Sequence, residues 1–328
     1  MSLTTGELRA LDPDNAAFGV TSGAVLPAPG DTYYEMPLLK RPHWEWEVIS
    51  YLFMGGIMGG SGILTLLADE HRDDEALSRS ARYVAFALAS TCPLVLIKHL
   101  GRPERFHHML RIWKFKSVMS MGVWGLIGFS LPATAAAAAQ ASRDGLLPGW
   151  IARLAPRAAT DPLSAVLGAF IAGYTGVLIS ATAIPVWGIG KRHIPAMSVC
   201  SGMAGACALN GAIVGLAGGR SSTLRKLERL ETVAGLAEAA LLLHFRRHAG
   251  TAGVPMFAGR RGRKLQNVTL LGGIAFPAAL NVLPFHARWK TLLATALTLA
   301  GGYVLRETLI ESGKDSADDP RAASRQPE

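Results

Sequence analysis

Two polar side chains lie four residues apart where the first apolar run of the chain begins. A helix places Glu47 and Tyr51 on one face, because residues four positions apart are neighbours on a helix surface. A quinol head group needs hydrogen-bond partners at its two oxygens and a route for two protons, which a carboxylate and a phenol supply. The pair is therefore a candidate quinone site. Alternatively, Trp44, Trp46 and Tyr51 form an aromatic belt that anchors the helix at the membrane surface.

A basic loop follows the second apolar run. Arg102 lies between Gly101, a residue type that often ends helices, and Pro103, which cannot continue one, so its guanidinium is held at the membrane–water boundary. That position suits an anionic or hydrogen-bonding partner. His99 ends the preceding run, so His99 and Arg102 join the quinone-site candidates. The alternative is that Arg102 only anchors a helix end by extending its charge to the interface.

The same loop carries four more basic residues, which are Arg105, Arg111, Lys114 and Lys116. Charge complementarity across an interface steers association and sets specificity. The loop is therefore predicted to form part of a docking face for an acidic or cluster-bearing protein.

Three acidic residues lie within the sixth apolar stretch, which are Glu228, Glu231 and Glu238. Glu231 and Glu238 are two helical turns apart and face the same way. Ionisable groups inside a membrane are costly and by default suggest a site. A proton relay and structural hydrogen bonding are both open for this pair. Glu228 lies closer to the water boundary, where it is suited to pairing with Arg225.

The chain lacks the ligand patterns of metal cofactors. Cys92, Cys200 and Cys207 lie inside apolar runs without the paired spacing that holds a cluster or zinc, so no iron–sulfur centre and no metal ion are expected. The histidines lie at the ends of apolar runs or in loops, which disfavours a bound haem. His99 and His244 lie on one side and could approach each other.

Composition defines the class of protein. Of the 328 residues, 50% are hydrophobic and 36 are Gly, and two polar tails lower the mean hydropathy to +0.27. Windows of about 20 residues predict an all-α polytopic membrane protein with eight transmembrane helices. The expected spans are 48–68, 82–100, 118–140, 162–187, 194–218, 224–245, 266–283 and 290–310. Gly-rich stretches in the first, fourth and fifth spans predict close helix packing.

The flanking segments and the charge bias give a topology. Residues 1–43 read as a polar N-terminal arm without the apolar core of a secretory signal, and residues 314–328 read as a disordered tail. The net charge of +9 reflects loops that face anionic lipid, so it is no argument for nucleic acid. Most Lys and Arg lie on the side of the N-terminus, which predicts both termini in the cytoplasm. A multi-pass protein of the inner (cytoplasmic) membrane is expected.

These motifs together resemble the NrfD / polysulfide reductase membrane-subunit family. The resemblance is carried by five segments, which are 46–60, 100–106, 117–124, 174–187 and 301–306. It implies a membrane domain over residues 44–313 with two four-helix bundles, about 44–187 and 194–310. Its members are eight-helix, cofactor-free subunits that bind quinone in iron–sulfur and molybdopterin enzyme complexes.

By resemblance, the pocket for menaquinone or ubiquinone lies in the first bundle, near the start of its first helix and the loop after its second. One departure is His99, where the family usually has Asp before Leu-Gly-Arg-Pro. An imidazole cannot replace a carboxylate in pairing Arg102, so the local proton chemistry is expected to differ. Familiar relatives often dock periplasmic partners, whereas the charge bias favours a cytoplasmic docking face.

The expected function is that of a subunit, not of a complete enzyme. The protein would exchange electrons and protons between quinone and a separate ferredoxin-like iron–sulfur protein, alongside a molybdopterin or other catalytic subunit. One alternative is a secondary transporter, which predicts broken helices at mid-membrane and paired repeats. The other is a purely structural anchor, which would neither reduce nor oxidise quinone.

Overall fold

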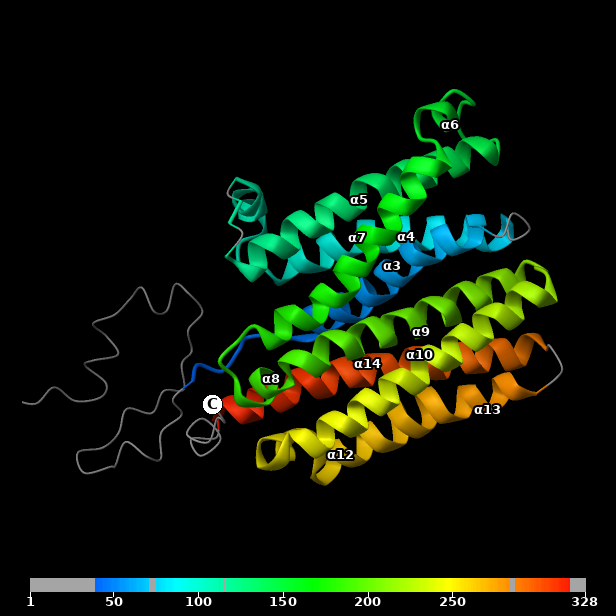
Figure 1. The fold of residues 1–328 in the computed structure, drawn as a ribbon. Helices are drawn as coiled ribbons and strands as arrows, with labels where there is room; N and C mark the ends of the chain where they lie inside the picture. The colour runs from blue at the N-terminus through cyan, green and yellow to red at the C-terminus, as the bar shows by residue number, and fades with distance from the viewer. Residues whose placement is uncertain (1–38, 71–74, 112, 115, 284–286, 319–328) are drawn as a thin grey trace, which may run out of the picture.

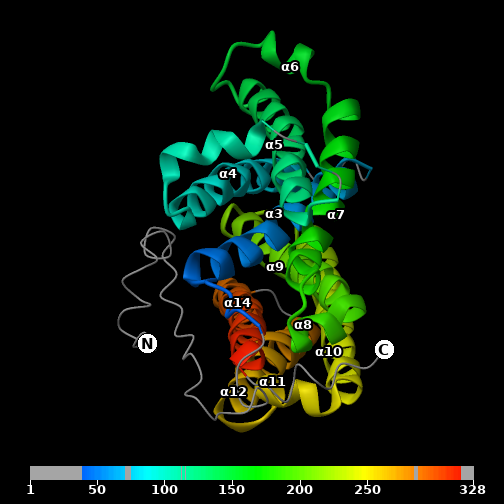
Figure 2. The ribbon, with the colours of Figure 1, turned by 90° about the vertical axis from the view of Figure 1, so that its left-hand side faces the viewer.

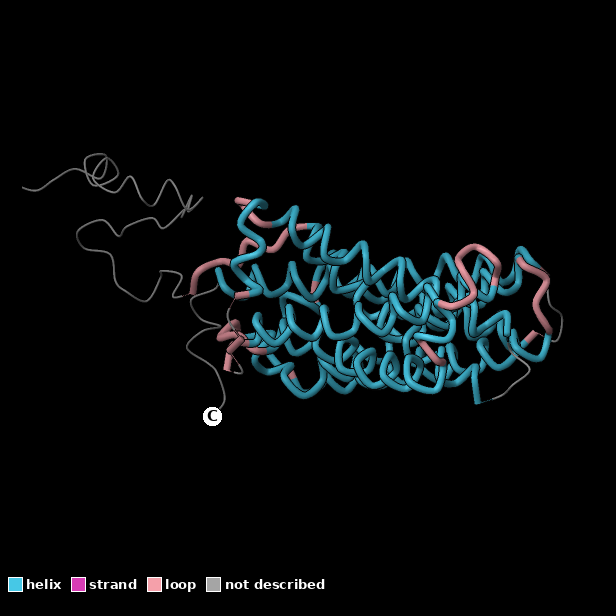
Figure 3. Tube along the Cα trace, turned by 90° about the horizontal axis from the view of Figure 1, so that it is seen from above, coloured by secondary structure: helices cyan, strands magenta, loops and turns pink. Residues whose placement is uncertain are grey.

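A computed structural model describes residues 39–70, 75–111, 113–114, 116–283 and 287–318. Within these residues every regular element is helical, as the apolar runs predict. The long helices lie side by side, and the connecting loops gather at two ends of the molecule (Figure 3). The all-α membrane fold is confirmed.

Four helices form one part of the molecule, drawn from blue to green in Figure 1. They are α3 (Trp46–Glu70), α4 (Glu75–His99), α5 (Val118–Arg143) and α7 (Arg157–Ser180). Helix α3 packs against both α4 and α7, and α5 covers the outer side of α4 and α7. Two short helices lie in the connections, η2 (Pro103–Leu110) and α6 (Ile151–Leu154).

The remaining long helices form the other part, drawn from green to red. They are α9 (His193–Leu216), α10 (Ser221–His248), a continuous helical stretch made of α12 (Gly259–Lys264), η5 (Leu265–Ala275) and α13 (Phe276–Val282), and α14 (Arg288–Asp318). We call that stretch helix 259–282. Short elements connect them, which are α8 (Pro185–Ile189), η3 (Gly190–Arg192), η4 (Gly250–Gly253) and α11 (Val254–Phe257).

Helix α3 lies between the two parts, with α9 and α14 on its other side (Figure 2). The α3–α9 contact is made by glycines. A Cβ atom on Gly56 would lie 3.1 Å from the Cα atom of Gly202, so the two backbones touch. Gly59 meets Gly168 of α7 in the same way. The predicted close packing through small residues is confirmed for these helices.

The chain alternates direction, so each end of the molecule holds a defined set of loops. One end holds the start of α3, the end of α4, η2, α8, α11 and the end of α14. We call it the η2 end, and the other the α6 end. Glu47, Tyr51, His99 and the basic loop all belong to the η2 end.

The described residues contain eight helical stretches of 24 residues or more. Six of them are long and apolar enough to cross a membrane. Helices α10 and α14 fall short on apolarity because they carry several charged side chains. The count of eight spans is therefore still a prediction.

Several predicted boundaries differ from the observed ones. Helix α4 begins at Glu75 instead of residue 82, and α7 runs from Arg157 to Ser180 instead of 162–187. Helix α14 continues to Asp318, so residues 314–318 are helical, and their assignment to a disordered tail is wrong. The physical reason is that hydropathy windows end at charged residues, whereas a helix continues when those charges find partners. The arm at 1–38 and residues 319–328 lie outside the described residues.

Candidate functional site

The first two turns of α3 place Glu47 and Tyr51 inside the protein. Their side chains share a face of α3, and the two residues are 9% and 2% exposed. The Oε2 atom of Glu47 is buried and has no hydrogen-bond partner within the described part of the chain. A buried carboxylate oxygen without a donor is costly. It is therefore an available acceptor for a polar ligand.

The last residues of α4, Lys98 and His99, contact residues at or just before the start of α3. The His99 ring stacks on His43, with 6.3 Å between ring centroids. The Lys98 ammonium lies 4.5 Å from the centre of the Trp46 ring, in the range of a cation–π contact. The structure thus brings His99 to the entrance of α3, next to the turn that carries Glu47.

Arg102 is exposed in the short connection between α4 and η2. Its backbone is not helical, with φ −132° and ψ 83°, because the following proline disfavours the helical conformation. Helix α4 ends at His99, two residues before Gly101, and Gly101 does not adopt a positive φ. Among the described residues Arg102 has no ion-pair partner. Arg102 is therefore exposed in the loop, whereas Glu47 is buried.

The rest of the basic loop has a definite shape. Pro103 starts η2, and the Trp113 ring stacks on Trp124 of α5 with 5.1 Å between centroids. The Ser117 side chain caps α5 by accepting from the Ser120 amide at 3.4 Å. The four predicted docking residues are all exposed at the η2 end; they are Arg105, Arg111, Lys114 and Lys116.

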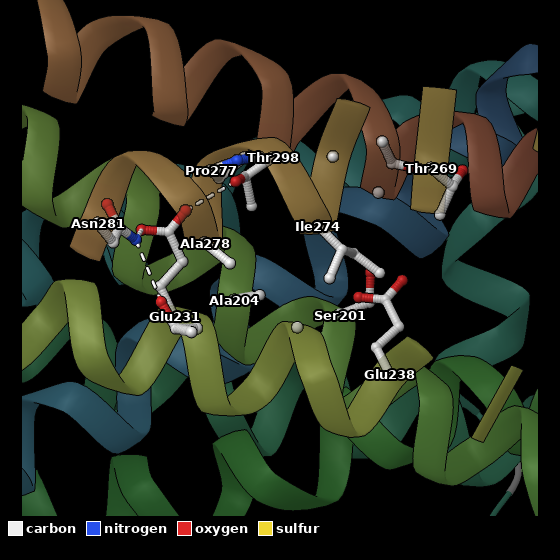
Figure 4. Close-up of a pocket in the computed structure, with 15 residues that line it drawn as sticks. Ser201, Ala204, Glu231, Glu238, Thr269, Ile274, Pro277, Ala278, Asn281 and Thr298 are labelled. Atoms are coloured by element: carbon white, nitrogen blue, oxygen red, sulfur yellow. Dashed lines mark hydrogen bonds between the residues drawn. The ribbon is translucent and has the colours of Figure 1, made fainter. Parts of the chain in front are cut away.

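Glu231 and Glu238 line one narrow cavity between α10, helix 259–282 and α14 (Figure 4). Glu231 accepts hydrogen bonds from Thr298 at 2.7 Å and from Asn281 at 3.4 Å. Glu238 is 3% exposed, and its Oε1 atom has no partner in the described structure. The cavity offers about 10 Å³ to water centres, enough for about one ordered water. Both acids face the same way, as their spacing predicts.

A buried lysine extends this polar region toward the α6 end. The Lys290 ammonium lies 3.4 Å from the Glu228 carboxylate and donates to the Leu283 carbonyl oxygen at 3.2 Å. The sequence suggested Arg225 as the partner of Glu228; the structure pairs it with Lys290 of α14. Asn281 links Glu228 and Glu231, because it donates to the Glu228 carbonyl oxygen at 3.3 Å and to the Glu231 carboxylate.

Arg306 is a buried cation that the sequence did not single out. It is 1% exposed on α14, and its Nη2 donates to the Ser198 carbonyl oxygen at 3.2 Å. Its Nε and Nη1 atoms have no partner among the described residues. Glu238 is close enough to interact with it electrostatically. The available signal was an arginine near the end of the predicted span 290–310.

A second buried cation lies in the other part of the molecule. Arg82 of α4 forms a two-pronged ion pair with Asp161 of α7, in which Nε is 3.2 Å from Oδ1. Its Nη1 also donates to Gln140 of α5 at 2.9 Å. These three residues connect three helices near the α6 end, away from the candidate quinone residues.

Three histidines gather at the η2 end of α9 and α10. The His193 ring centroid is 5.1 Å from that of His244 and 5.5 Å from that of His248. Because His99 stacks on His43 instead, the suggested approach of His99 to His244 is wrong. Among the described residues no group of three or more His, Cys, Asp or Glu side chains has the arrangement of a metal site.

Long apolar helices joined by short loops, with charged side chains buried between them, define a polytopic α-helical membrane protein. The family described as "Polysulphide reductase, NrfD" matches residues 37–314. The protein therefore belongs to the NrfD family.

Individual relatives agree with this assignment. The sequence is 26% identical over 302 residues to the C chain of polysulfide reductase from Wolinella succinogenes, covering 83% of this chain and 94% of that protein. It is 24% identical to the "Protein NrfD homolog" of Haemophilus influenzae, with the same two coverages. It is 28% identical to "Protein NrfD" of Escherichia coli over 42% of this chain and 49% of that protein. The first name describes one component of a reductase with several different chains.

Proposed function

We propose that this protein is the membrane subunit of a respiratory oxidoreductase complex, in which it passes electrons between membrane quinone and a separate iron–sulfur subunit. The observation that carries the proposal is the buried, unpartnered Oε2 atom of Glu47, one turn from Tyr51 at the η2 end. A quinone head group, whether of menaquinone or ubiquinone, presents two oxygens that such side chains can bind.

The residues divide the work as follows. The Tyr51 hydroxyl donates a hydrogen bond to one quinone oxygen. The Glu47 carboxylate accepts the two protons one after the other when quinol is oxidised, or returns them one after the other when quinone is reduced. His99, stacked on His43 at the entrance, passes each proton on to the surroundings, because its two ring nitrogens can accept and donate. Two electrons pass per quinone molecule. They go to the partner protein when quinol is oxidised and come from it when quinone is reduced.

The partner subunit docks at the η2 end. Arg102, Arg105, Arg111, Lys114 and Lys116 are exposed there, which suits a partner with an acidic, ferredoxin-like surface. A molybdopterin or other catalytic subunit completes the complex. The positive charge of this end supports a cytoplasmic location for the docking face and an inner-membrane location for the protein.

Glu231 and Glu238 are proposed to carry protons through the other part of the molecule. The carboxylates share a cavity with room for a water, and Glu238 keeps one oxygen without a partner among the described residues. Replacing Glu238 by Gln should slow quinone-coupled proton uptake while electron transfer to an artificial dye continues. Equal proton uptake in the variant would leave Glu238 with a purely structural role.

The test of the quinone site compares Tyr51→Phe and Glu47→Gln in the assembled complex. Loss of one hydrogen bond to a buried ligand costs about 1–3 kcal/mol, so each change should reduce quinone turnover roughly tenfold. Activity of the partner subunits with an artificial dye should be unchanged.

Two matched controls use the same chemistry elsewhere. Glu45→Gln alters an exposed acid that pairs with His43, and Tyr83→Phe removes a phenol at the α6 end. Both should keep wild-type quinone turnover. If Tyr51→Phe and Glu47→Gln also keep it, the quinone site is elsewhere. If the wild-type complex does not react with quinone at all, the protein is a structural anchor.

A further inference from the structure

A crevice opens between the end of α10 and the start of helix 259–282. Its volume is about 280 Å³. It lies at the η2 end of the second part of the molecule and shares no lining residue with the cavity of Glu231 and Glu238. Figure 1 shows α12, which begins helix 259–282, at that end. The lining residues are Leu242, Leu243, Arg246, Phe257, Gly259, Gly262, Arg263, Leu265, Gln266 and Leu270.

The lining is ordered along the helix axes. Arg246 lies in the last turn of α10, and Leu242 and Leu243 lie one turn further into the bundle. Arg263 lies in the second turn of helix 259–282, and Leu270 lies two turns deeper. The crevice therefore has a cationic mouth at the end of the bundle and an apolar floor toward its middle.

The cations at this mouth differ from their neighbours. On the same short helix, Arg261 pairs with Asp315 and Lys264 pairs with Glu307 at 2.6 Å. Both carboxylates belong to α14. Arg246 and Arg263 form no ion pair with any described residue. Two exposed guanidiniums across one crevice are thus available to an anion from outside the protein.

The position of the crevice narrows the class of anion. Helix 259–282 is apolar enough to span a membrane, so its first turns lie at the level of the lipid head groups. A phosphate is bound well by guanidinium groups, which donate in a planar fork. An apolar floor directly below two arginines matches a molecule with a phosphate at one end and an acyl chain at the other.

We infer that this crevice binds one anionic phospholipid, with its phosphate held between Arg246 and Arg263. The first part of an acyl chain lies along Leu243 and Leu270. Basic pockets between transmembrane helices commonly bind lipid head groups in this way. The bound lipid fills the gap between α10 and helix 259–282, which the protein's own side chains leave open.

The test is native mass spectrometry of the full-length protein in detergent, titrated with phosphatidylglycerol or phosphatidylcholine of the same acyl length. We expect one phosphatidylglycerol to bind ahead of all others, with clear preference over phosphatidylcholine. Arg246→Gln and Arg263→Gln should each weaken it roughly fivefold, and the double variant more. Leu243→Trp, which fills the apolar floor, should also weaken it.

The control is the double variant Arg247→Gln with Arg260→Gln, which removes two exposed charges from the same end without touching the crevice. It should bind phosphatidylglycerol as the wild type does. An equal loss in this control would reduce the effect to general surface charge and overturn the inference.

Two competition arms identify the occupant. Inorganic phosphate at millimolar concentration should not displace the lipid; full displacement would make the crevice a site for small anions and overturn the inference. A short-chain quinone should not displace it either, and displacement would assign the crevice to quinone. Unchanged lipid binding in Leu243→Trp would remove the acyl chain from the crevice and contradict the assignment.

Discussion

Arg82 and Asp161 lie 79 residues apart in the sequence and form a closed ion pair between α4 and α7. Both residues are 1% exposed. Gln140 of α5 accepts a further hydrogen bond from Arg82 at 2.9 Å. One guanidinium thus joins three helices of the part that holds Glu47 and Tyr51.

Replacing Asp161 by Asn should destabilise the protein strongly. The change keeps the size of the side chain but leaves the Arg82 charge buried without a counter-charge, which typically costs about 3–5 kcal/mol. Thermal unfolding in detergent measures the loss. Glu307→Gln is the control, because the side chains of the Lys264–Glu307 pair are 45% and 34% exposed and exposed pairs contribute about 0–1 kcal/mol. Equal losses in the two variants would contradict this ranking.

Gly→Ala substitutions should affect stability differently at Gly202, which lies in the contact between α3 and α9, and at Gly173 of α7, which has more room. A Cβ on Gly202 would lie 2.6 Å from the Gly56 carbonyl oxygen, so Gly202→Ala should destabilise by about 1–3 kcal/mol. A Cβ on Gly173 would lie 3.6 Å from Val199, an ordinary contact. Gly173→Ala should therefore be neutral or stabilising by up to about 1 kcal/mol. The melting temperatures of the two variants test this difference, and an equal loss in both would contradict it.

Charge reversal in the basic loop should weaken assembly. Arg105→Glu with Arg111→Glu places carboxylates where an acidic partner is proposed to dock, and rim charges act mainly on association in a salt-dependent way. Co-purification of the partner at low and high salt measures the effect. Arg153→Glu, at the exposed α6 connection, should leave co-purification intact. Unchanged assembly of the double variant would move the interface elsewhere.

Asp144, just beyond the end of α5, predicts a pH effect. Desolvation favours its neutral form, but hydrogen bonds from Tyr83, Gln140 and Arg79 and the Arg79 charge prevail and lower its pKa. A lowered pKa means that the ionised form stabilises the fold. This contribution is complete above the ordinary value of about 4 and is lost as the pH falls through the lowered pKa.

Unfolding temperatures of the wild type and Asp144→Asn, compared between about pH 6 and pH 3, test this effect. Near the upper end of this pH range the wild type should be more stable than Asp144→Asn. The difference should shrink as the solution is acidified. A constant difference across the range would show that ionisation of Asp144 does not contribute.

The sequence predicted relationships within one helix better than those between helices. The shared face of Glu231 and Glu238 follows from helical periodicity alone, and both line one cavity. The Arg82–Asp161 and Lys290–Glu228 pairs did not follow, because each charge is neutralised by a residue from another helix. In a hydropathy window such a charge only lowers the average and ends the predicted span.

The same limit applies to the candidate quinone site. Spacing placed Glu47 and Tyr51 on one face, and the end of α4 brings His99 against His43, just before the start of α3. Residue spacing could not place Arg102, because its position depends on the path of a loop. Nor could it show that Glu47 keeps a carboxylate oxygen without a donor among the described residues, since that depends on every neighbouring side chain.

The backbone contact between Gly56 and Gly202 bears on how the molecule can move. Alternating access requires one half of a transporter to rock against the other about a central site. Here the seam between α3 and α9 has no side chains at these two positions that could rearrange, and the main chains are so close that even an added Cβ atom would collide with the facing backbone. Such a seam resists both sliding and tilting, as close-packed interiors do. A fixed spacing between α3 and α9 disfavours the rocking that the transporter alternative requires.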